Sequence, residues 1–338
     1  MEKRNVTLQE VARKAGVSKA TASAVLSGNH PHVRVSEDTR RRILEAVREL
    51  DYNPNAIARS LLGGKTNTLG FYRHDTLLSG FHAEIVAGLQ AGCLEARRDL
   101  LLYGAFQGKT TAETYAGLVD CRADGLAILL FPDDPLIELL RESRLPVVAV
   151  ADAVPGIPSV TADDVLGGTM TAAHLHERGH RNVLYFARVR PPVSCERRYR
   201  AFVAEAERRG LRVITQAVND LTPPDWGIPD WRSDEIRRLF SGPERDRPTA
   251  VVCWSDVGAG GVLRQCERYG LRIPEDLALV GFDGVAIDGT RIANLTTIRA
   301  PWGDVARTAI RLLVRRIEGE IIPEETPLPV TLLQGTTT

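Results

Sequence analysis

The chain has 338 residues with 43 basic and 43 acidic side chains, so its formal net charge is zero, and 43% of its residues are hydrophobic. That length allows several domains with cores of their own. No stretch approaches the 18 consecutive apolar residues of a transmembrane helix, and the first residues lack the apolar core of a secretory signal. The five cysteines are widely spaced and odd in number, which predicts reduced thiols. We therefore expect a cytoplasmic protein.

Residues 7–28 have the pattern of two short helices joined by a tight turn. Thr7 and Glu10 have the spacing of a capping box. Gly16 can take the left-handed conformation that ends the first helix, and Ser18 is a natural N-cap for the second. A helix-turn-helix of this kind lays its second helix in the DNA major groove.

A structural helical hairpin is the alternative interpretation of these two helices. Such a short pair has little surface to bury, so a third helix should follow it. Residues 36–50 predict that helix, because Ser36 can cap it and Ile43, Val47 and Leu50 are apolar. Its arginines are predicted to face mostly outward.

Residues 53–64 predict a fourth, marginal helix. Asn53 suits the N-cap and Pro54 the first helical position, and two glycines end the segment. About eight helical residues are fewer than the ~12–15 that a helix needs to be stable alone in water, so it should order only against a partner. A small apolar face suits insertion into a minor groove, and it consists of Ala58, Leu61 and Leu62. A linker helix buried on its own protein is the alternative.

Residues 6–70 resemble the headpiece and hinge of the LacI/GalR family of bacterial transcription regulators. The matching words are Val-Thr-Leu-Gln-Glu-Val-Ala, Ala-Gly-Val-Ser, Thr21-Ala-Ser23 and Tyr52-Asn-Pro-Asn-Ala-Ile-Ala-Arg-Ser-Leu61. The resemblance implies a transcriptional repressor that binds a pseudo-palindromic double-stranded DNA operator as a homodimer. By this match Lys19, Ala20 and Ala24 face base edges, Ser18, Thr21 and Ser23 hold phosphates, and Leu61 enters the minor groove. The full set of DNA-binding residues that we predict is Thr7, Ser18, Lys19, Ala20, Thr21, Ser23, Ala24, Asn29, Asn55, Ala58 and Leu61.

Three departures from the family pattern concern the operator. The family usually has valine where Ala22 stands and arginine where Ala24 stands, and the loop 29–34 is about three residues longer than usual. Arginine reads guanine bidentately, whereas alanine can at most touch a thymine methyl group. The operator should therefore differ from the common family half-site.

The distribution of charge agrees with one DNA-binding end. Residues 1–65 contain 12 basic and 7 acidic side chains, a net charge of +5, and residues 66–338 carry the opposite net charge of −5. Only a basic end is suited to meet phosphate.

From Leu69 onward, short apolar strands alternate with amphipathic helices. The predicted strands are 69–72, 100–103, 125–130, 147–150, 183–186, 212–218, 250–254 and 278–282. The predicted helices are 81–97, 111–121, 134–143, 164–178, 195–209, 231–241 and 256–269. Alternation of this kind predicts parallel sheets with right-handed crossovers, and this many strands suits two doubly wound lobes.

The expected fold class is therefore α/β, with an all-α helix-turn-helix headpiece and two doubly wound parallel-sheet lobes of the periplasmic-binding-protein type. The headpiece takes residues 1–52, the hinge helix and linker 53–66, and the effector-binding and dimerisation core 67–338. The chain is expected to cross between lobes near residues 160, 288 and 325. The N-lobe then takes about 67–160 and 289–325, and the C-lobe about 161–288 and 326–338.

Residues 69–335 resemble the effector-binding core of the same family through words such as Arg178-Gly-His180 and Gly281-Phe-Asp283. The resemblance implies that Arg198, Asp256 and Asp283 contact the effector, although Ser255 stands where the family usually has asparagine. A small polyol needs charged acceptors, a bidentate donor and a flat apolar face. Candidates for that face, or for the same crevice, are Phe81, Trp226, Trp231, Trp254, His74 and Asp75. Each tryptophan taken singly suits packing as well, and Arg198 could be a surface charge.

Several motifs do not support another function. His176 and His180 are separated by the helix-ending Gly179, so they do not predict a metal site. The residues before Lys65-Thr66 lack the earlier glycine of a phosphate-binding loop, and no catalytic triad stands out. We therefore predict no enzyme activity, no metal and no cofactor. A solute-binding protein would need a signal peptide and would have no headpiece. The effector is predicted to be a sugar or sugar derivative, and a purine stays open.

Overall fold

The computed structural model describes residues 6–27, 35–52, 65–73, 80–104, 108–218, 228–230, 233–241, 243–285 and 294–338. The chain forms two compact units, Met1–Asn67 and Thr68–Thr338. Several predicted features lie outside the described residues, namely the hinge helix over 53–64, Asn29, Asn55, Ala58, Leu61, His74, Asp75, Trp226 and Trp231. No helix within the described ranges is long and apolar enough to span a membrane.

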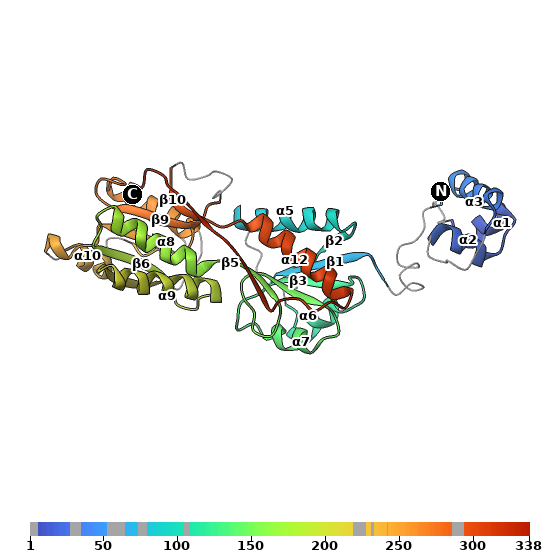
Figure 1. Ribbon diagram of the computed structural model, residues 1–338, viewed down its shortest axis with the longest axis horizontal. Coiled ribbons are helices and arrows are strands. Elements are labelled where there is room, and N and C mark those ends of the chain that lie inside the picture. Colours follow the sequence, from blue (N-terminus) through green and yellow to red (C-terminus); the bar gives the residue numbers. More distant parts are fainter. Residues whose placement is uncertain are drawn as a thin grey trace. The chain divides into compact units, whose positions relative to one another are not determined.

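The described part of the first unit contains the three predicted helices, α1 (Leu8–Ala15), α2 (Lys19–Ser27) and α3 (Glu37–Glu49) (Figure 1). The predicted capping box is present, because Thr7 Oγ1 accepts from the Glu10 amide and the Glu10 carboxylate accepts from the Thr7 amide. Gly16 ends α1 with a φ of 66°, a conformation that is free of strain only for glycine. The helix-turn-helix prediction is therefore confirmed.

An apolar cluster joins these three helices. Its buried members are Val11, Ala15, Val25, Ile43 and Ala46. Arg42 adds a polar contact, because its Nη1 donates to the Ala15 carbonyl at 3.1 Å, at the end of α1 that favours a cation. The third helix thus supplies the surface that a helix pair alone would lack.

The second unit consists of two lobes, each built on a six-stranded sheet. The N-lobe sheet has the order β11-β5-β4-β3-β1-β2, and its neighbouring strands run parallel. Its strands are β1 (Thr68–Arg73), β2 (Asp99–Leu102), β3 (Gly125–Leu129), β4 (Val147–Ala151), β5 (Ser159–Ala162) and β11 (Glu325–Leu328). Its helices are α5 (Gly80–Glu95), α6 (Thr111–Leu118), α7 (Leu136–Glu142) and α12 (Trp302–Ile317).

The C-lobe sheet has the order β12-β10-β9-β8-β6-β7, in which only β12 runs antiparallel to its neighbour. Its strands are β6 (Asn182–Arg188), β7 (Arg212–Val218), β8 (Ala250–Cys253), β9 (Ala278–Asp283), β10 (Thr296–Arg299) and β12 (Thr331–Leu333). Its helices are α8 (Asp164–Glu177), α9 (Val193–Arg208), α10 (Asp234–Ser241) and α11 (Asp256–Tyr269), with a short 3-10 turn at Glu244–Asp246.

Helices cover both faces of each sheet. Alternate residues of a strand point in opposite directions, so each strand contributes side chains to both faces. In β6, Val183 and Tyr185 pack in the apolar cluster of α8 and α9, whereas Leu184 and Phe186 pack in that of α10 and α11. The N-lobe strands divide in the same way between α5 with α12 and α6 with α7. The predicted fold class is confirmed.

The crossings between lobes differ from those predicted. Strand β10 lies beside β9 in the C-lobe sheet, so the second crossing between lobes follows residue 299 and not residue 288. The predicted N-lobe segment 289–325 therefore begins too early in the chain. The third crossing lies between β11 and β12, beyond residue 328 (Figure 1). Strands β5, β10, β11 and β12 were not predicted, because each is short and contains threonine or other polar residues, so none forms an apolar run like that of β8. Helix α12 was also missed.

Helices α5 and α12 approach closely on one face of the N-lobe sheet. A Cβ atom at Gly88 would lie 2.2 Å from the Gly303 carbonyl oxygen and 2.8 Å from the Ala306 Cβ. A Cβ at Gly92 would lie 2.8 Å from the Ile310 Cβ. The glycines of α5 therefore determine how near the two helices lie.

We predict that Gly88→Ala lowers the free energy of unfolding of the second unit by about 1–3 kcal/mol, because the added methyl group meets a backbone atom that cannot move alone. Gly303→Ala is the matched control in the same contact, since its Cβ would meet nothing nearer than the Glu84 carbonyl oxygen at 3.9 Å. We expect the control to be neutral or more stable by up to about 1 kcal/mol. Urea unfolding measures both, and equal stabilities of the two variants would contradict the prediction.

Candidate DNA-binding headpiece and effector site

The amino end of α2 presents polar groups to solvent. Thr7, Ser18, Lys19 and Ala20 are exposed, and Thr21 and Ser23 are partly exposed. Ser18 Oγ accepts from the Thr21 amide at 3.0 Å and lies 2.8 Å from Thr21 Oγ1, which fixes both hydroxyls at the first turn. Free amide groups, the helix dipole and a nearby cation together suit this end for a phosphate.

Ala24 differs from its predicted position. It is only 8% exposed, so its methyl group packs within the headpiece and does not face outward toward base edges. Ala22 is fully buried as well. Burial explains why small residues fit both positions, and it leaves Lys19 and Ala20 as the exposed candidates for base contact in α2.

In the second unit, Arg198 is the centre of a buried polar cluster. Its guanidinium donates to Asp164 Oδ1 through Nη2 at 2.8 Å and through Nε at 3.3 Å, and Nη1 donates to the Trp254 carbonyl. The guanidinium carbon also lies 3.2 Å from the centre of the Phe282 ring, a cation–π contact. Arg198 is 5% exposed, so the alternative of a surface charge is wrong.

Asp256 and Asp283, the other two predicted polar contacts, lie in the same cluster. Asp256 Oδ1 accepts from Thr297 Oγ1 at 2.6 Å, and Oδ2 accepts from the Val285 amide at 2.9 Å. Burial raises the pKa of both carboxyl groups, and Arg198 opposes that rise for each of them. Burial also opposes the charge of Arg198, yet the neighbouring Asp164 carboxylate raises its pKa above the ordinary value. The cluster therefore holds one firmly protonated cation and a surplus of acidic groups.

The two lobes meet beside this cluster. Asp152, just after β4 of the N-lobe, accepts from the backbone amides of Val193 and Ser194 at the start of α9 in the C-lobe, at 3.2 and 2.8 Å. Arg188, at the end of β6, lies 5.5 Å from the ring of Phe131 in the N-lobe. The carboxyl ends of strands from both sheets thus face each other, as parallel α/β lobes require for a ligand site.

Backbone strain marks the same strand ends. Ala151 ends β4 with a φ of 72°, and Asp283 ends β9 with a φ of 110°. A positive φ in a residue with a side chain costs about 1–3 kcal/mol and is found most often at functional sites. Both strained residues adjoin or belong to the polar cluster.

Trp254 and Phe81 are the described aromatic residues of the predicted apolar face, and each packs against neighbouring residues. Trp254 is 6% exposed, and its ring lies against Gly258 in the apolar cluster of α11, which matches the packing alternative. Phe81 packs edge to face against Trp302 at 4.8 Å and against His82 at 4.9 Å. Burial, with a smaller contribution from Arg73, lowers the pKa of His82 to about 4, so this imidazole is neutral at physiological pH.

Two buried carboxylates of the cluster were not predicted, Asp152 and Asp164. Asp152 directly follows β4, and Asp164 begins α8 two residues after the end of β5. Position after a strand was therefore the signal that could have found them, but β5 itself was too short to recognise. Ser255, where the family has asparagine, caps α11 by accepting from the Gly258 amide at 3.4 Å.

The histidines of the rejected metal motif have separate partners. His174 Nε2 lies 2.8 Å from Thr338 Oγ1, and His180 Nδ1 lies 2.9 Å from Thr249 Oγ1. Each imidazole is thus engaged with a different hydroxyl group of the C-lobe.

Comparison with known proteins agrees with this architecture. Residues 7–55 match the model for bacterial regulatory proteins of the lacI family, and residues 172–338 match that for a periplasmic binding protein-like domain. An HTH-type transcriptional repressor PurR of Aliivibrio fischeri is 30% identical over 323 residues, which cover 92% of each chain. The chain belongs to the LacI family of bacterial regulatory proteins. As a LacI-family member it is a DNA-binding transcriptional regulator.

Other transcriptional regulators are similar to the chain over nearly its full length. Catabolite control protein A of Priestia megaterium is 29% identical over 325 residues, which cover 94% of each chain. A solved Lac repressor dimer, bound to operator and the anti-inducer ONPF, has a TM-score of 0.81 at 24% identity and covers 99% of both chains. The complex of the transcriptional regulator CelR with cellobiose has a TM-score of 0.69 at 26% identity, over 99% of this chain and 100% of the CelR chain.

We predict that Asp152 makes the stability of this LacI-family core depend on pH. Burial raises the pKa of Asp152 to about 6 from 3.8, although three backbone amides oppose that rise. Between about pH 4 and 6 the folded chain holds a proton that the unfolded chain releases, so the free energy of unfolding falls as pH rises through this window. The contribution is complete below about pH 4 and amounts to about 2–3 kcal/mol.

Asp152→Asn removes this titration, so its midpoint in thermal unfolding should fall less between pH 4.5 and 7.5 than that of the unchanged protein. Asp304→Asn, at an exposed position of α12, is the control and should keep the original dependence. Parallel curves for all three proteins would show that Asp152 does not titrate in this range.

Proposed function

We propose that the protein is a cytoplasmic, non-catalytic repressor that binds a two-fold-symmetric operator as a homodimer and responds to a small molecule held between its lobes. The observation that carries the DNA-binding half is the amino end of α2, where exposed hydroxyl groups and Lys19 surround free helix amides. A helix-turn-helix dimer reads two half-sites with matching symmetry. The solved Lac repressor relative is a dimer on its operator, which supports the same assembly here.

The effector class follows from the buried cluster. Asp256, Asp283 and Asp152 are acceptors and Arg198 is a donor, and a polyhydroxylated ligand supplies the hydroxyl groups that such a set can bind. The CelR relative was solved with cellobiose, which supports a carbohydrate or carbohydrate derivative. The 30% identity to PurR repressors keeps a purine as the second candidate.

Response to the effector is proposed to act through the lobes. A ligand that contacts the N-lobe and C-lobe ends of the cluster changes the relative free energies of their arrangements. In a dimer that change alters the spacing of the two DNA-binding units, and a short hinge helix is sensitive to such a change.

We predict that Lys19→Ala weakens binding to the specific operator by about 1–3 kcal/mol, because a cation that faces base edges or phosphate is lost. Enrichment of binding sites from a random DNA library supplies the operator, and fluorescence titration at two salt concentrations measures affinity. Lys14→Ala is the matched control, since the Lys14 ammonium is paired with Glu49 at 2.5 Å. The DNA-binding proposal fails if no two-fold-symmetric site is enriched, and the α2 assignment fails if both variants bind alike.

We also predict that Asp283→Asn abolishes or strongly reduces the effector response while operator affinity stays within about twofold. Asparagine keeps the shape of aspartate, so the fold is retained, but it removes an acceptor of the cluster. The effector is found first by thermal unfolding against a panel of sugars, sugar phosphates and nucleobases, where a ligand at about 100 times its Kd adds about 2.7 kcal/mol. Asp304→Asn should respond like the unchanged protein. A full response in Asp283→Asn would remove this residue from the effector site.

A further inference from the structure

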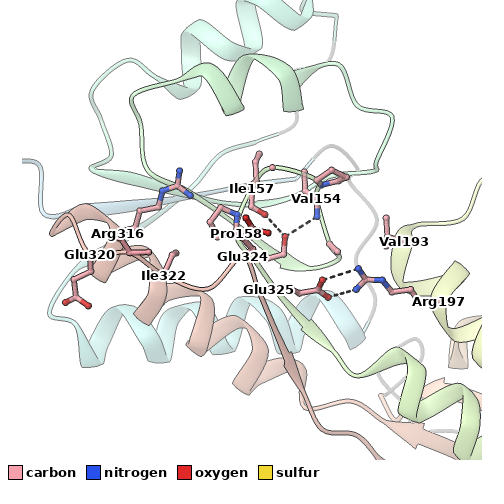
Figure 2. Close-up of a pocket in the computed structure, with 15 residues that line it drawn as sticks. Val154, Ile157, Pro158, Val193, Arg197, Arg316, Glu320, Ile322, Glu324 and Glu325 are labelled. Carbon is pink, nitrogen blue, oxygen red and sulfur yellow. Dashed lines mark hydrogen bonds and ion pairs between the residues drawn. The ribbon is translucent and has the colours of Figure 1, made fainter.

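A second pocket, of about 570 Å³, lies where the two lobes join (Figure 2). Its walls are the β4–β5 loop at residues 153–159, the segment 320–325 between α12 and β11, and Val193 and Arg197 of α9. Small-molecule sites have volumes of roughly 300–1,000 Å³, so the size suits a metabolite. None of the candidate effector contacts that the structure describes is among its lining residues, which distinguishes this pocket from the proposed effector site.

Arg316 supplies this pocket with a cation that has no carboxylate partner among the described residues. Its Nη1 donates to the Val147 carbonyl at 3.1 Å. Burial alone lowers the pKa of Arg316, which is the shift expected of a guanidinium whose charge no neighbouring carboxylate offsets. Within the described ranges no group bonds the edge formed by Nε and Nη2, and this edge matches a carboxylate bidentately.

Glu324 supplies the opposite charge. It lines the pocket and is exposed, and no side chain or amide of the described residues bonds its carboxylate. The other acidic groups of the pocket are already neutralised. Glu325 accepts from Arg197 Nη2 at 3.0 Å and from Thr161 at 3.2 Å, and Glu320 accepts from Arg315 at 2.7 Å. Of the charged lining residues that the structure describes, Arg316 and Glu324 therefore remain for a ligand.

The rest of the lining is largely apolar. Val154 and Ile157 are buried in the N-lobe core, and Pro158, Val193 and Ile322 are partly buried around the opening. Such walls suit the aliphatic body of a ligand. Figure 2 shows Arg316 at one end of the pocket and the Arg197–Glu325 ion pair at the other.

We propose that this pocket binds a small zwitterionic molecule of the amino-acid class, with its carboxylate on Arg316, its ammonium on Glu324 and its aliphatic part on Ile157 and Ile322. The ligand ammonium offsets the Glu324 carboxylate, and the ligand carboxylate offsets the Arg316 guanidinium. Because α9 belongs to the C-lobe and the other walls to the N-lobe, the occupant stabilises the arrangement of lobes described here. The site is thus a second input to the regulator, distinct from the proposed effector.

Isothermal titration of the full chain tests this proposal with two zwitterions of different charge separation, leucine and 6-aminohexanoate. 4-Methylpentanoate, which lacks the ammonium, and 3-methylbutylamine, which lacks the carboxylate, are the chemical controls. We expect at least one zwitterion to bind saturably at one site per chain, and each control to bind at least tenfold more weakly.

Two variants locate the site. Arg316→Gln and Glu324→Gln should each weaken binding of the zwitterion at least tenfold. The controls Arg311→Gln and Glu318→Gln change exposed charges of the same helix end outside the pocket and should have no effect. The Glu324 carboxylate has no bonding partner in the described part of the chain, so its variant keeps the test valid if Arg316→Gln is unstable.

Three outcomes would overturn the proposal. Neither zwitterion binds at 10 mM, or 4-methylpentanoate binds as tightly as leucine, or both pocket variants bind the zwitterion as the unchanged protein does. The last outcome would show that the zwitterion binds to another part of the chain.

Discussion

The buried charge of Arg198 is the constraint on which the core of this regulator depends. Removing a guanidinium from water costs several kcal/mol, and only well-placed partners offset that cost. Here the partners come from three separate elements, namely Asp164 at the start of α8, the carbonyl at the end of β8, and the Phe282 ring of β9. Loss of either charge of such a pair costs about 3–5 kcal/mol, so these elements are held in one geometry.

Close packing of two helices makes this ion pair possible. A Cβ at Gly168 would lie 2.2 Å from the Arg198 carbonyl oxygen, so α8 and α9 can be this near only because residue 168 is glycine. Asp164 lies one turn before Gly168 on the same helical face. The small residue thus brings the Asp164 carboxylate within reach of the Arg198 guanidinium. The ion pair therefore depends on the close packing of α8 and α9.

The surplus of acidic groups around Arg198 connects stability with ligand binding. Burial raises the pKa of Asp152, Asp256 and Asp283, which means that burial destabilises their ionised forms. A ligand that donates hydrogen bonds stabilises those forms, so the core gains stability when it is occupied. The strained backbone at Ala151 and Asp283 adds to the free energy that such contacts can offset. A site of this kind suits a protein whose task is to change state on binding.

The sequence by itself determined the headpiece, because capping groups, the left-handed glycine and helical periodicity all act within a few residues of one another. Thr7 with Glu10, Gly16 and Ser18 could be read in the chain and have the predicted geometry. The longer strands and helices of the core were predictable for the same reason, and resemblance pointed to Arg198, Asp256 and Asp283. Contacts between distant segments were not predictable from local patterns. Only the tertiary structure decided that β10 joins the C-lobe, that Ala24 is buried, that Asp164 pairs with Arg198, and that Arg316 and Glu324 line one pocket. Each of these depends on which surfaces meet after folding, and a short strand or a lone charge carries no local signal of its partner.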